Sequence, residues 1–199
     1  MQRAAEKYDP IYERYAAVSV SELATGEEYA EAREMGKRLY LTYCMQCHGS
    51  DARGSRGYPN LVDNDWLWGG TPEQILASIA VGRTAVMPAH AHLSEEAVDG
   101  LASYVLSLSG RDVDAAKAEK GKETYLTAGC IGCHGVDGTG NQMLGAPNLT
   151  DKVWLYGGSE GMVAESIIEG RNGVMPAHDE LLGDNKIHIL TAYVYSLSK

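Results

Sequence analysis

The pentapeptide Cys44-Met45-Gln46-Cys47-His48 recurs in the second half of the chain as Cys130-Ile131-Gly132-Cys133-His134. Together the two copies contain all 4 cysteines of the 199-residue sequence. Two cysteines separated by two residues and followed directly by a histidine form the attachment motif of a c-type heme. The thiols bond to the heme vinyl groups, and the histidine binds the iron as proximal ligand. The sequence therefore predicts two heme c groups, attached through Cys44 and Cys47 and through Cys130 and Cys133, with His48 and His134 as axial ligands.

Two other kinds of site also use closely spaced cysteines. A redox disulfide requires Cys-x-x-Cys but gives no reason for the histidine that follows it. A zinc site requires four ligands brought together by short spacings, whereas each pentapeptide crowds its cysteines and histidine into a single short segment. Heme attachment explains every fixed position of the motif and also its repetition, so it is the favoured interpretation.

The similarity between the two halves extends well beyond the cysteines. Trp66-Leu-Trp-Gly-Gly70 corresponds to Trp154-Leu-Tyr-Gly-Gly158, and Gly82-Arg-Thr-Ala-Val-Met-Pro-Ala-His90 corresponds to Gly170-Arg-Asn-Gly-Val-Met-Pro-Ala-His178. An internal repeat of this length predicts two domains of one architecture. The predicted parts are an N-terminal extension (1–32), a first domain (33–110), a linker (111–116) and a second domain (117–199).

The secondary structure is predicted to be helices separated by long loops. Thr71-Pro-Glu-Gln74 is a capping box with proline at the first helical position, which is typical of a helix start. No alternating β pattern of useful length is present. Helices are expected over residues 33–43, 71–81, 94–109, 117–127, 160–169 and 184–198. The predicted fold is all-α, with a few helices in each domain around one covalent heme that completes an otherwise marginal core.

A second axial ligand for each iron is expected from the repeated Val-Met-Pro-Ala-His segment. Met87 and Met175 occupy the same place in the two halves, and each precedes a proline that stiffens the loop. Thioether ligation suits an iron that changes charge without changing geometry, and it raises the reduction potential. His90 and His178 are rival ligands, so bis-histidine ligation in one half stays open.

Three further repeated pairs are expected to support the hemes. A proximal histidine donates its other ring N–H to a carbonyl, and the segments at Pro59 and Pro147 are placed to supply it. Partly buried heme propionates require cationic or N–H donors. The candidates for that role are Arg83, Arg171 and the indoles of Trp66 and Trp154, although plain packing would also explain the tryptophans.

The charge and hydropathy of the chain narrow its possible partners. The 17 basic and 27 acidic side chains give a formal net charge of −10, which disfavours nucleic-acid binding and suits a basic protein partner. No run approaches the roughly 20 apolar residues that span a membrane, and no signal peptide is recognisable. Because c-type heme is attached outside the bacterial cytoplasm, we expect a processed or trimmed chain without its membrane anchor.

With these motifs combined, the chain resembles a tandem class I cytochrome c. It is most similar to the diheme cytochrome c subunit (subunit III) of the cbb-type, or C-family, heme–copper cytochrome c oxidases. The resemblance covers nearly all of residues 11–199. It rests on Tyr15-Ala-Ala-Val-Ser-Val20, the Trp-x-x-Gly-Gly elements, the Gly-Arg-Asn-Gly-Val-Met-Pro-Ala segment and the ending Ala192-Tyr-Val-Tyr-Ser-Leu-Ser198.

The resemblance implies an electron relay on the periplasmic side of the bacterial inner membrane. Electrons would enter from a small cytochrome c, pass through both hemes, and continue to a monoheme subunit and the catalytic subunit that reduces oxygen. The membrane would be reached only through an anchor absent from this chain, with residues 1–32 contacting neighbouring subunits. The implied ligand sets are Cys44, Cys47, His48 and Met87 for the first heme and Cys130, Cys133, His134 and Met175 for the second.

Other functions use similar motifs. A free diheme cytochrome c, or the cytochrome subunit of a periplasmic dehydrogenase, would share most of them. A diheme peroxidase is an alternative of another class, and it requires one heme that loses its distal ligand next to an acid–base group. Because both halves contain the same Met-Pro-Ala sequence, the sequence favours an electron-transfer module without chemistry of its own.

Overall fold

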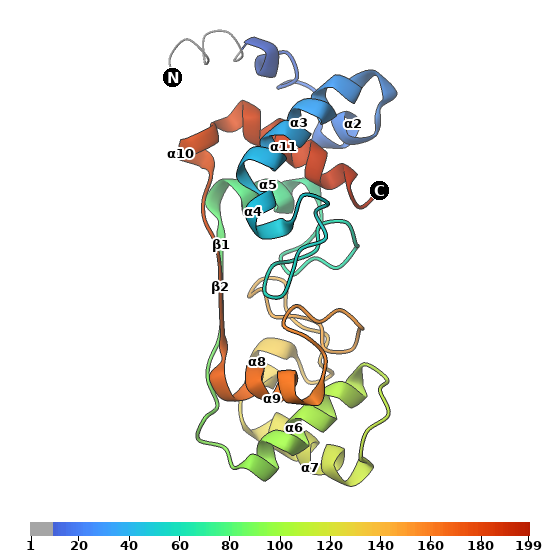
Figure 1. Ribbon diagram of the computed structural model, residues 1–199, viewed down its shortest axis with the longest axis vertical. Helices are drawn as coiled ribbons and strands as arrows, with labels where there is room; N and C mark the ends of the chain where they lie inside the picture. The colour runs from blue at the N-terminus through green and yellow to red at the C-terminus, as the bar shows by residue number, and fades with distance from the viewer. Residues whose placement is uncertain (1–9) are drawn as a thin grey trace. The chain divides into compact units, whose positions relative to one another are not determined.

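The computed structural model describes residues 10–199, which form mainly helices joined by long loops (Figure 1). The predicted all-α class is confirmed, and the predicted helices are present within a few residues of their expected bounds. The first repeat contains α3 (Ala30–Tyr43), α4 (Met45–His48), α5 (Pro72–Val81) and α6 (Glu95–Leu108). The second contains α7 (Ala115–Thr127), α8 (Ile131–His134), α9 (Glu160–Glu169), α10 (Asp179–Leu182) and α11 (Asp184–Ser196).

The predicted N-terminal extension is partly helical. Its first nine residues lie outside the described part of the chain. Ser19 caps α2 (Val20–Thr25) through a capping box with Glu22, and the short 3-10 helix η1 (Glu27–Tyr29) leads into α3. Leu23 of α2 is fully buried in a cluster that includes residues of α3 and α11. The described part of the extension is therefore built into the core.

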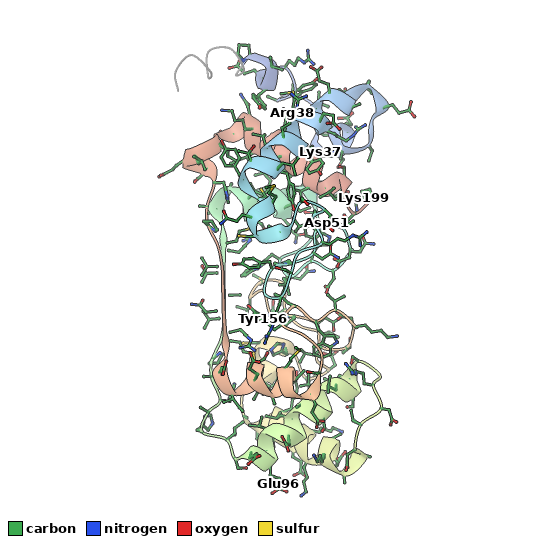
Figure 2. The ribbon with its side chains drawn as sticks, viewed as in Figure 1. Lys37, Arg38, Asp51, Glu96, Tyr156 and Lys199 are labelled. Atoms are coloured by element: carbon green, nitrogen blue, oxygen red, sulfur yellow. The ribbon has the colours of Figure 1, made fainter. Side chains whose placement is uncertain are left out.

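The helices are amphipathic, and α3 is the clearest example. Lys37 and Arg38 lie on the exposed side of this helix, whereas Leu39 and Tyr40 are buried (Figure 2). Helix α3 therefore presents one polar face to solvent and one apolar face to the core. Its C-terminus leads directly into the first cysteine motif.

Two short strands were not expected from the sequence. Strand β1 (Arg83–Met87) and strand β2 (Arg171–Met175) pair as a two-stranded sheet, so the prediction of no β structure is wrong for these residues. In both strands half-buried and exposed residues alternate, but over only five positions. A pattern this short does not stand out from the surrounding loops in the sequence.

The two compact units of the fold do not coincide with the two sequence repeats. The first unit consists of the chain up to Arg83 together with Met175–Lys199, and the second consists of Thr84–Val174. The chain therefore leaves the first unit along β1 and returns to it along β2 (Figure 1). The predicted domain bounds describe the repeats along the sequence, whereas the folded units exchange the C-terminal part of each repeat.

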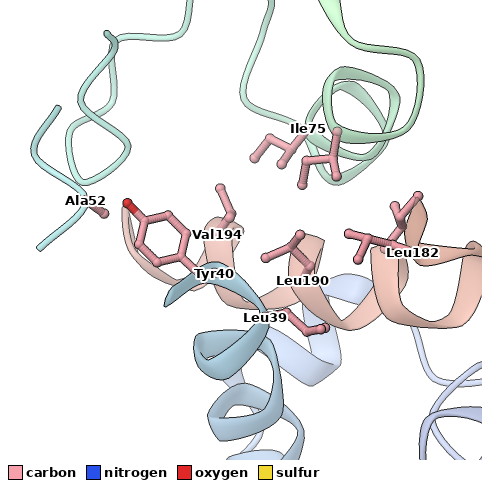
Figure 3. Close-up of a cluster of buried hydrophobic side chains, with 9 residues drawn as sticks. Leu39, Tyr40, Ala52, Ile75, Leu182, Leu190 and Val194 are labelled. Carbon is pink, nitrogen blue, oxygen red and sulfur yellow. The ribbon is translucent and has the colours of Figure 1, made fainter. Parts of the chain in front are cut away.

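The core of the first unit lies where α11 packs against α3 and α5. Leu39 and Tyr40 of α3, Ile75 of α5 and Leu190 of α11 belong to one buried cluster (Figure 3). A Cβ atom added at Gly36 would lie 2.7 Å from the carbonyl oxygen of Ile189, so only glycine permits this approach of α3 and α11. The last helix of the second repeat thus completes the core of the first.

The second unit is built in the same way, with the roles of the repeats reversed. Helix α6 packs against α7 and α9, and its residues Leu101 and Val105 are buried together with Tyr125 and Ile167. A Cβ atom added at Gly121 of α7 would lie only 1.9 Å from the carbonyl oxygen of Gly100 of α6. The last helix of the first repeat thus completes the core of the second.

Candidate heme-binding sites

The first cysteine motif forms a short turn of helix directly after α3. Cys44 is the residue between α3 and α4, and His48 is the last residue of α4. Residues three and four apart in a helix share a face, so Cys44, Cys47 and His48 project toward one side. The two thiols are free, and burial, followed by the neighbouring Cys47, raises the pKa of Cys44 to about 11.

The imidazole of His48 is oriented by a backbone carbonyl. Its Nδ1 lies 2.9 Å from the carbonyl oxygen of Pro59, which is the contact expected for a proximal histidine. Burial lowers the pKa of His48, and the hydrogen bond to Pro59 opposes that effect. A neutral ring whose Nδ1–H donates to Pro59 has its Nε2 lone pair available for a metal.

The second motif repeats this geometry. The Nδ1 of His134 lies 3.1 Å from the carbonyl oxygen of Pro147, and the side chain is buried. Burial again lowers the pKa of the imidazole and raises the pKa of the Cys130 thiol. The same three groups, two free thiols and one oriented imidazole, are therefore presented in each unit.

A tyrosine that was not singled out from the sequence forms a hydrogen bond to the backbone directly after each cysteine motif. The hydroxyl of Tyr40 donates to the carbonyl oxygen of Gly49, and the hydroxyl of Tyr125 donates to that of Gly135, both over 2.6 Å. Both rings are almost completely buried. The available signal was their equivalent position in the two repeats, four residues after the matching glycines Gly36 and Gly121.

The methionines are exchanged relative to the pairing that the resemblance implies. Met175 packs, together with Cys44, against the apolar cluster of the first unit. Met87 packs, together with Cys130, against the cluster of the second unit. The structure thus places Met175 at the cluster of Cys44 and Met87 at that of Cys130, and which iron each methionine binds stays a prediction.

The backbone that follows each methionine is hydrogen-bonded to the last turn of a helix from the other repeat. The amide of His178 donates to the carbonyl oxygen of Ile79 in α5, and a Cβ atom at Gly82 would lie 2.4 Å from the carbonyl oxygen of Met175. The second unit has the matching hydrogen bond from His90 to Ile167. Gly82 also has a φ of 72°, which disfavours other residues at this position.

Arg83 and Arg171 lie beside the helices that precede them. Arg83 donates to Ser78 over 2.9 Å and lies above the ring of Trp68. Arg171 donates to Ser166 over 3.1 Å and lies above the ring of Tyr156. The aromatic residues Trp68 and Tyr156 are equivalent in the two repeats and had not been singled out. Contact of either guanidinium with a heme propionate stays a prediction.

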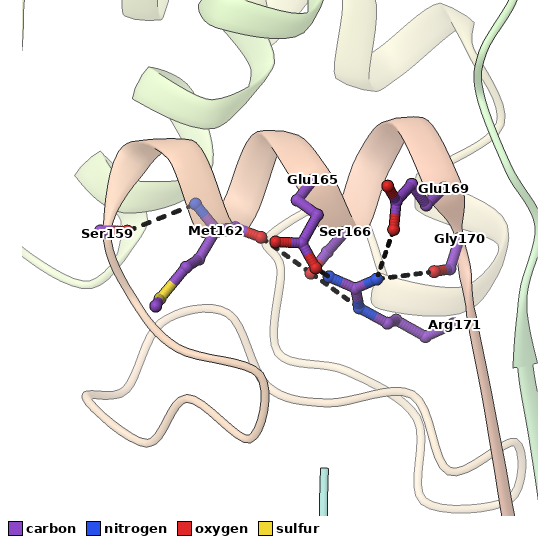
Figure 4. A network of polar contacts seen from close by, with 7 residues as sticks. All are labelled: Ser159, Met162, Glu165, Ser166, Glu169, Gly170 and Arg171. Carbon is purple, nitrogen blue, oxygen red and sulfur yellow. Dashed lines mark hydrogen bonds and ion pairs between the residues drawn. The ribbon is translucent and has the colours of Figure 1, made fainter. Parts of the chain in front are cut away.

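The two arginines differ in their carboxylate partners. Arg171 forms ion pairs with Glu165 at 2.8 Å and Glu169 at 3.5 Å (Figure 4). Within residues 10–199, Arg83 has no carboxylate in ion-pair contact. The corresponding positions before Arg83 are Ala77 and Val81. The positive charge of Arg171 is therefore partly neutralised by carboxylates, whereas that of Arg83 is not so neutralised among the described residues.

The remaining predicted residues also lie in the two units. Trp66 packs against the apolar cluster of the first unit and Trp154 against that of the second, as the packing interpretation requires. His90 and His178 each have a buried Nδ1 without a hydrogen-bond partner among the described residues. These free ring nitrogens keep histidine ligation as an alternative that spectroscopy has to test.

The residues of each unit fit a covalently attached heme. Each unit contains two free thiols and an imidazole held at Nδ1, and the first cysteine of each motif packs against the same apolar cluster as a methionine. Thiols for attachment and a His/Met pair for the iron are the donor set of a cytochrome c. The iron would supply the one-electron redox chemistry. Within residues 10–199, no helix is both long and apolar enough to cross a membrane.

Comparison with known proteins agrees with this donor set. The model of the family described as cytochrome c oxidase, cbb3-type, subunit III matches residues 31–105 and 116–194. Subunit CcoP of the cbb3-type cytochrome c oxidase of Rubrivivax gelatinosus is 43% identical over 201 residues, which cover 100% of this chain and 64% of that protein. Subunit FixP of Bradyrhizobium diazoefficiens is 41% identical over 204 residues, covering 93% and 69% of the two chains. Subunit CcoP of Cereibacter sphaeroides is 42% identical over 178 residues, covering 83% and 61%. The chain thus spans about two thirds of the length of these relatives.

Proposed function

Because the chain belongs to the family of subunit III of cbb3-type cytochrome c oxidases, we propose that it is a two-heme electron relay. In this proposal it accepts electrons from a small soluble cytochrome c on the periplasmic side of the membrane. It passes them through two heme c groups to the monoheme and catalytic subunits, where oxygen is reduced. The relatives are named as subunits of cbb3-type oxidases, which supports partners of this kind.

One observation carries this proposal. In each compact unit the first cysteine of the Cys-x-x-Cys-His turn and a methionine pack against the same apolar cluster. Iron bound by His48 or His134 on one side and by a methionine on the other is six-coordinate. Such an iron has no position for a substrate, so the site is suited to electron transfer and not to peroxide cleavage.

The protein groups around each site favour this role. The imidazole is held by a carbonyl of Pro59 or Pro147, which fixes its orientation in both oxidation states. A ligand set that does not rearrange on oxidation or reduction of the iron lowers the reorganisation energy of electron transfer. The net charge of −10 favours encounter with a basic donor cytochrome over an acidic one.

The proposal is tested with the heme-loaded chain in stopped-flow mixing with a reduced, basic, monoheme cytochrome c. We expect two hemes per chain, rapid reduction of both, and a rate that falls steeply as ionic strength rises, because opposite charges steer the encounter. An acidic cytochrome c of similar potential serves as the matched control and should react more slowly. Salt-independent reduction together with turnover of hydrogen peroxide would instead support a peroxidase.

A further inference from the structure

We propose that His90 and His178 each donate a hydrogen bond from the ring Nδ1 to a propionate of the heme in their compact unit. His178 belongs to the first unit and His90 to the second, and each follows a predicted methionine ligand by three positions. This role rests on the proposed two-heme relay, and neither the attachment motifs nor the predicted axial ligands account for it.

The first observation is a buried nitrogen without a partner. Within residues 10–199, the Nδ1 atoms of His90 and His178 are the only buried side-chain polar atoms that form no hydrogen bond. A buried polar atom left unpaired costs about 1–3 kcal/mol, and native structures pair the large majority of such groups. Each nitrogen is therefore expected to meet a group that is not part of the polypeptide.

The second observation is that the two histidines are equivalent in sequence and in structure. Each ends a copy of Val-Met-Pro-Ala-His. The amide of His178 donates to the carbonyl oxygen of Ile79 over 3.1 Å, and the amide of His90 donates to that of Ile167 over 2.9 Å. The same unpaired nitrogen thus recurs in the same surroundings, which a chance packing defect in one unit does not explain.

The third observation is that the chain on both sides of each imidazole is held at an apolar cluster. Met175 precedes His178 and Leu182 follows it, and both contact the cluster against which Cys44 packs. The corresponding residues of the second unit are Met87, His90, Leu93 and Cys130. Each histidine is therefore tied to the cluster that would enclose a heme attached at the neighbouring cysteines.

The surroundings favour a carboxylate as the partner of each nitrogen. A buried water typically makes about three hydrogen bonds to otherwise unpaired polar groups. Each compact unit contains only one unpaired, buried side-chain polar atom among the described residues. A heme carries two propionates, and a carboxylate that is partly buried requires N–H donors. The donor in the protein and the acceptor on the heme therefore satisfy each other.

The two arginines that the sequence suggested for the propionates already have partners in the protein. Arg171 pairs with Glu165 and Glu169, and Arg83 donates to Ser78. The Nδ1 atoms of the two histidines, in contrast, are used by no described residue.

The expected effect on the iron follows from the charge of the propionate. A hydrogen bond from Nδ1–H draws negative charge away from the iron and holds the propionate in place. Without this bond the surroundings of the iron are more negative, which favours the ferric state and lowers the reduction potential. His90 and His178 are thus positioning residues that act on the iron through the heme.

Spectroelectrochemical titration of the heme-loaded full chain tests this role. His178→Leu removes the donor and should lower one potential by about two- to tenfold in the one-electron equilibrium, of which tenfold equals about 59 mV. His178→Asn places an amide N–H near the position of Nδ1 and should keep both potentials nearly unchanged. The same two substitutions at His90 should act on the other heme. His92→Leu, at an exposed ring 5.8 Å from that of His90, is the control.

A second measurement on the unaltered protein locates the proton directly. In the reduced, diamagnetic state labelled with 15N-histidine, we expect two slowly exchanging Nδ1–H resonances that are lost in the His90→Asn and His178→Asn variants, respectively. Nuclear Overhauser effects from these protons to propionate methylene protons support the proposal. Their contact with water alone would refute it. If a leucine variant fails to take up heme, this measurement decides.

The remaining outcomes separate this role from the proposed relay. Unchanged potentials in both leucine variants, or equal shifts in leucine and asparagine variants, would overturn the hydrogen bond and leave the relay intact. Conversion of one heme to a five-coordinate form in a leucine variant would identify that histidine as an iron ligand, which also overturns the proposal. Fewer than two hemes in the unaltered protein would refute the proposed function as well.

Discussion

The hydroxyl of Tyr40 donates a 2.6 Å hydrogen bond to the carbonyl oxygen of Gly49, the residue that directly follows His48. Tyr40 is fully buried. Its hydrogen bond joins the C-terminal part of α3 to the turn that carries the predicted iron ligand. The equivalent bond from Tyr125 to Gly135 holds the second motif in the same way. Each proximal histidine is therefore fixed from both sides, by a proline carbonyl at its ring and by a tyrosine at its backbone.

Removing one of these hydroxyls tests this relationship. Tyr40→Phe keeps the buried ring but leaves the partly buried Gly49 carbonyl without its donor, which costs about 0.5–1.5 kcal/mol. We expect a loss of that size in the free energy of unfolding by guanidinium. Tyr43→Phe, at a side chain that is 41% exposed, is the control and should change stability little. Equal effects of the two variants would show that the hydrogen bond is not important.

The buried hydroxyl of Tyr125 makes the free energy of unfolding depend on pH. Burial, the largest cause, raises the pKa of Tyr125 to about 12 from an ordinary value of 10.0. The folded state thus holds this proton more tightly than the unfolded state does. Its contribution, on the order of 2 kcal/mol, is fully present below pH 10 and is lost as the pH rises toward 12.

This pH effect is measured by guanidinium unfolding between pH 8 and about pH 11, a range that spans the unfolded pKa of tyrosine. Stability should fall less steeply with rising pH in Tyr125→Phe than in the unaltered protein. Tyr58→Phe, at a side chain that is 44% exposed, controls for lysines and the other tyrosines. Parallel curves for the unaltered protein and Tyr125→Phe would contradict the assignment.

Gly121 marks the closest approach between α6 and α7. A Cβ atom at this residue would lie 1.9 Å from the carbonyl oxygen of Gly100, so Gly121→Ala forces the two helices apart. We expect a destabilisation of about 1–3 kcal/mol or more. Gly161→Ala on α9, where nothing lies within 4 Å of the added Cβ, should be neutral or slightly stabilising. A thermal unfolding series that ranks the two variants the other way would refute the α6–α7 crossing.

The carboxylates around Arg171 predict a difference between the hemes. Glu165 pairs with Arg171 at 2.8 Å, and removing its charge in Glu165→Gln leaves the arginine less neutralised. A more positive surrounding disfavours the ferric state, so we expect one of the two reduction potentials to rise. The rise should be smaller than about 59 mV, a tenfold change in a one-electron equilibrium.

Spectroelectrochemical titration measures this shift. Glu119→Gln, which removes an exposed carboxylate elsewhere in the second unit, is the matched control and should leave both potentials nearly unchanged. A fall of either potential in Glu165→Gln, or equal shifts in the two variants, would be inconsistent with a local effect through Arg171.

The sequence was sufficient to predict the helices, because they depend on local chemistry, whereas heme attachment and methionine ligation stay predictions. Cys44, Cys47 and His48 lie within one turn, and Thr71 caps its helix through residues next to it. The exchange of the two C-terminal segments was not predicted. Met87 and Met175 each lie in a copy of the Val-Met-Pro-Ala-His sequence. The residues around them therefore do not indicate which cysteine motif each methionine lies near.

The information for the exchange is distributed over residues far apart in the sequence. It appears where the repeats differ, as in Lys117 and Lys120 opposite Asp99 and Glu96. Comparing the helix faces of the two repeats for charge complementarity would have detected it. The strands β1 and β2, which carry the chain between the units, were missed because they contain only five residues each.

The most direct test of the central claim is the near-infrared charge-transfer band from methionine sulfur to ferric iron, normalised to the heme content of the chain. Two closed His/Met sites predict an intensity that corresponds to two hemes, with no binding of carbon monoxide after reduction. An intensity that corresponds to one heme would mean that His90, His178 or another group binds one iron. That result, or an absent band with a five-coordinate spectrum, would contradict the account of two closed electron-carrying sites.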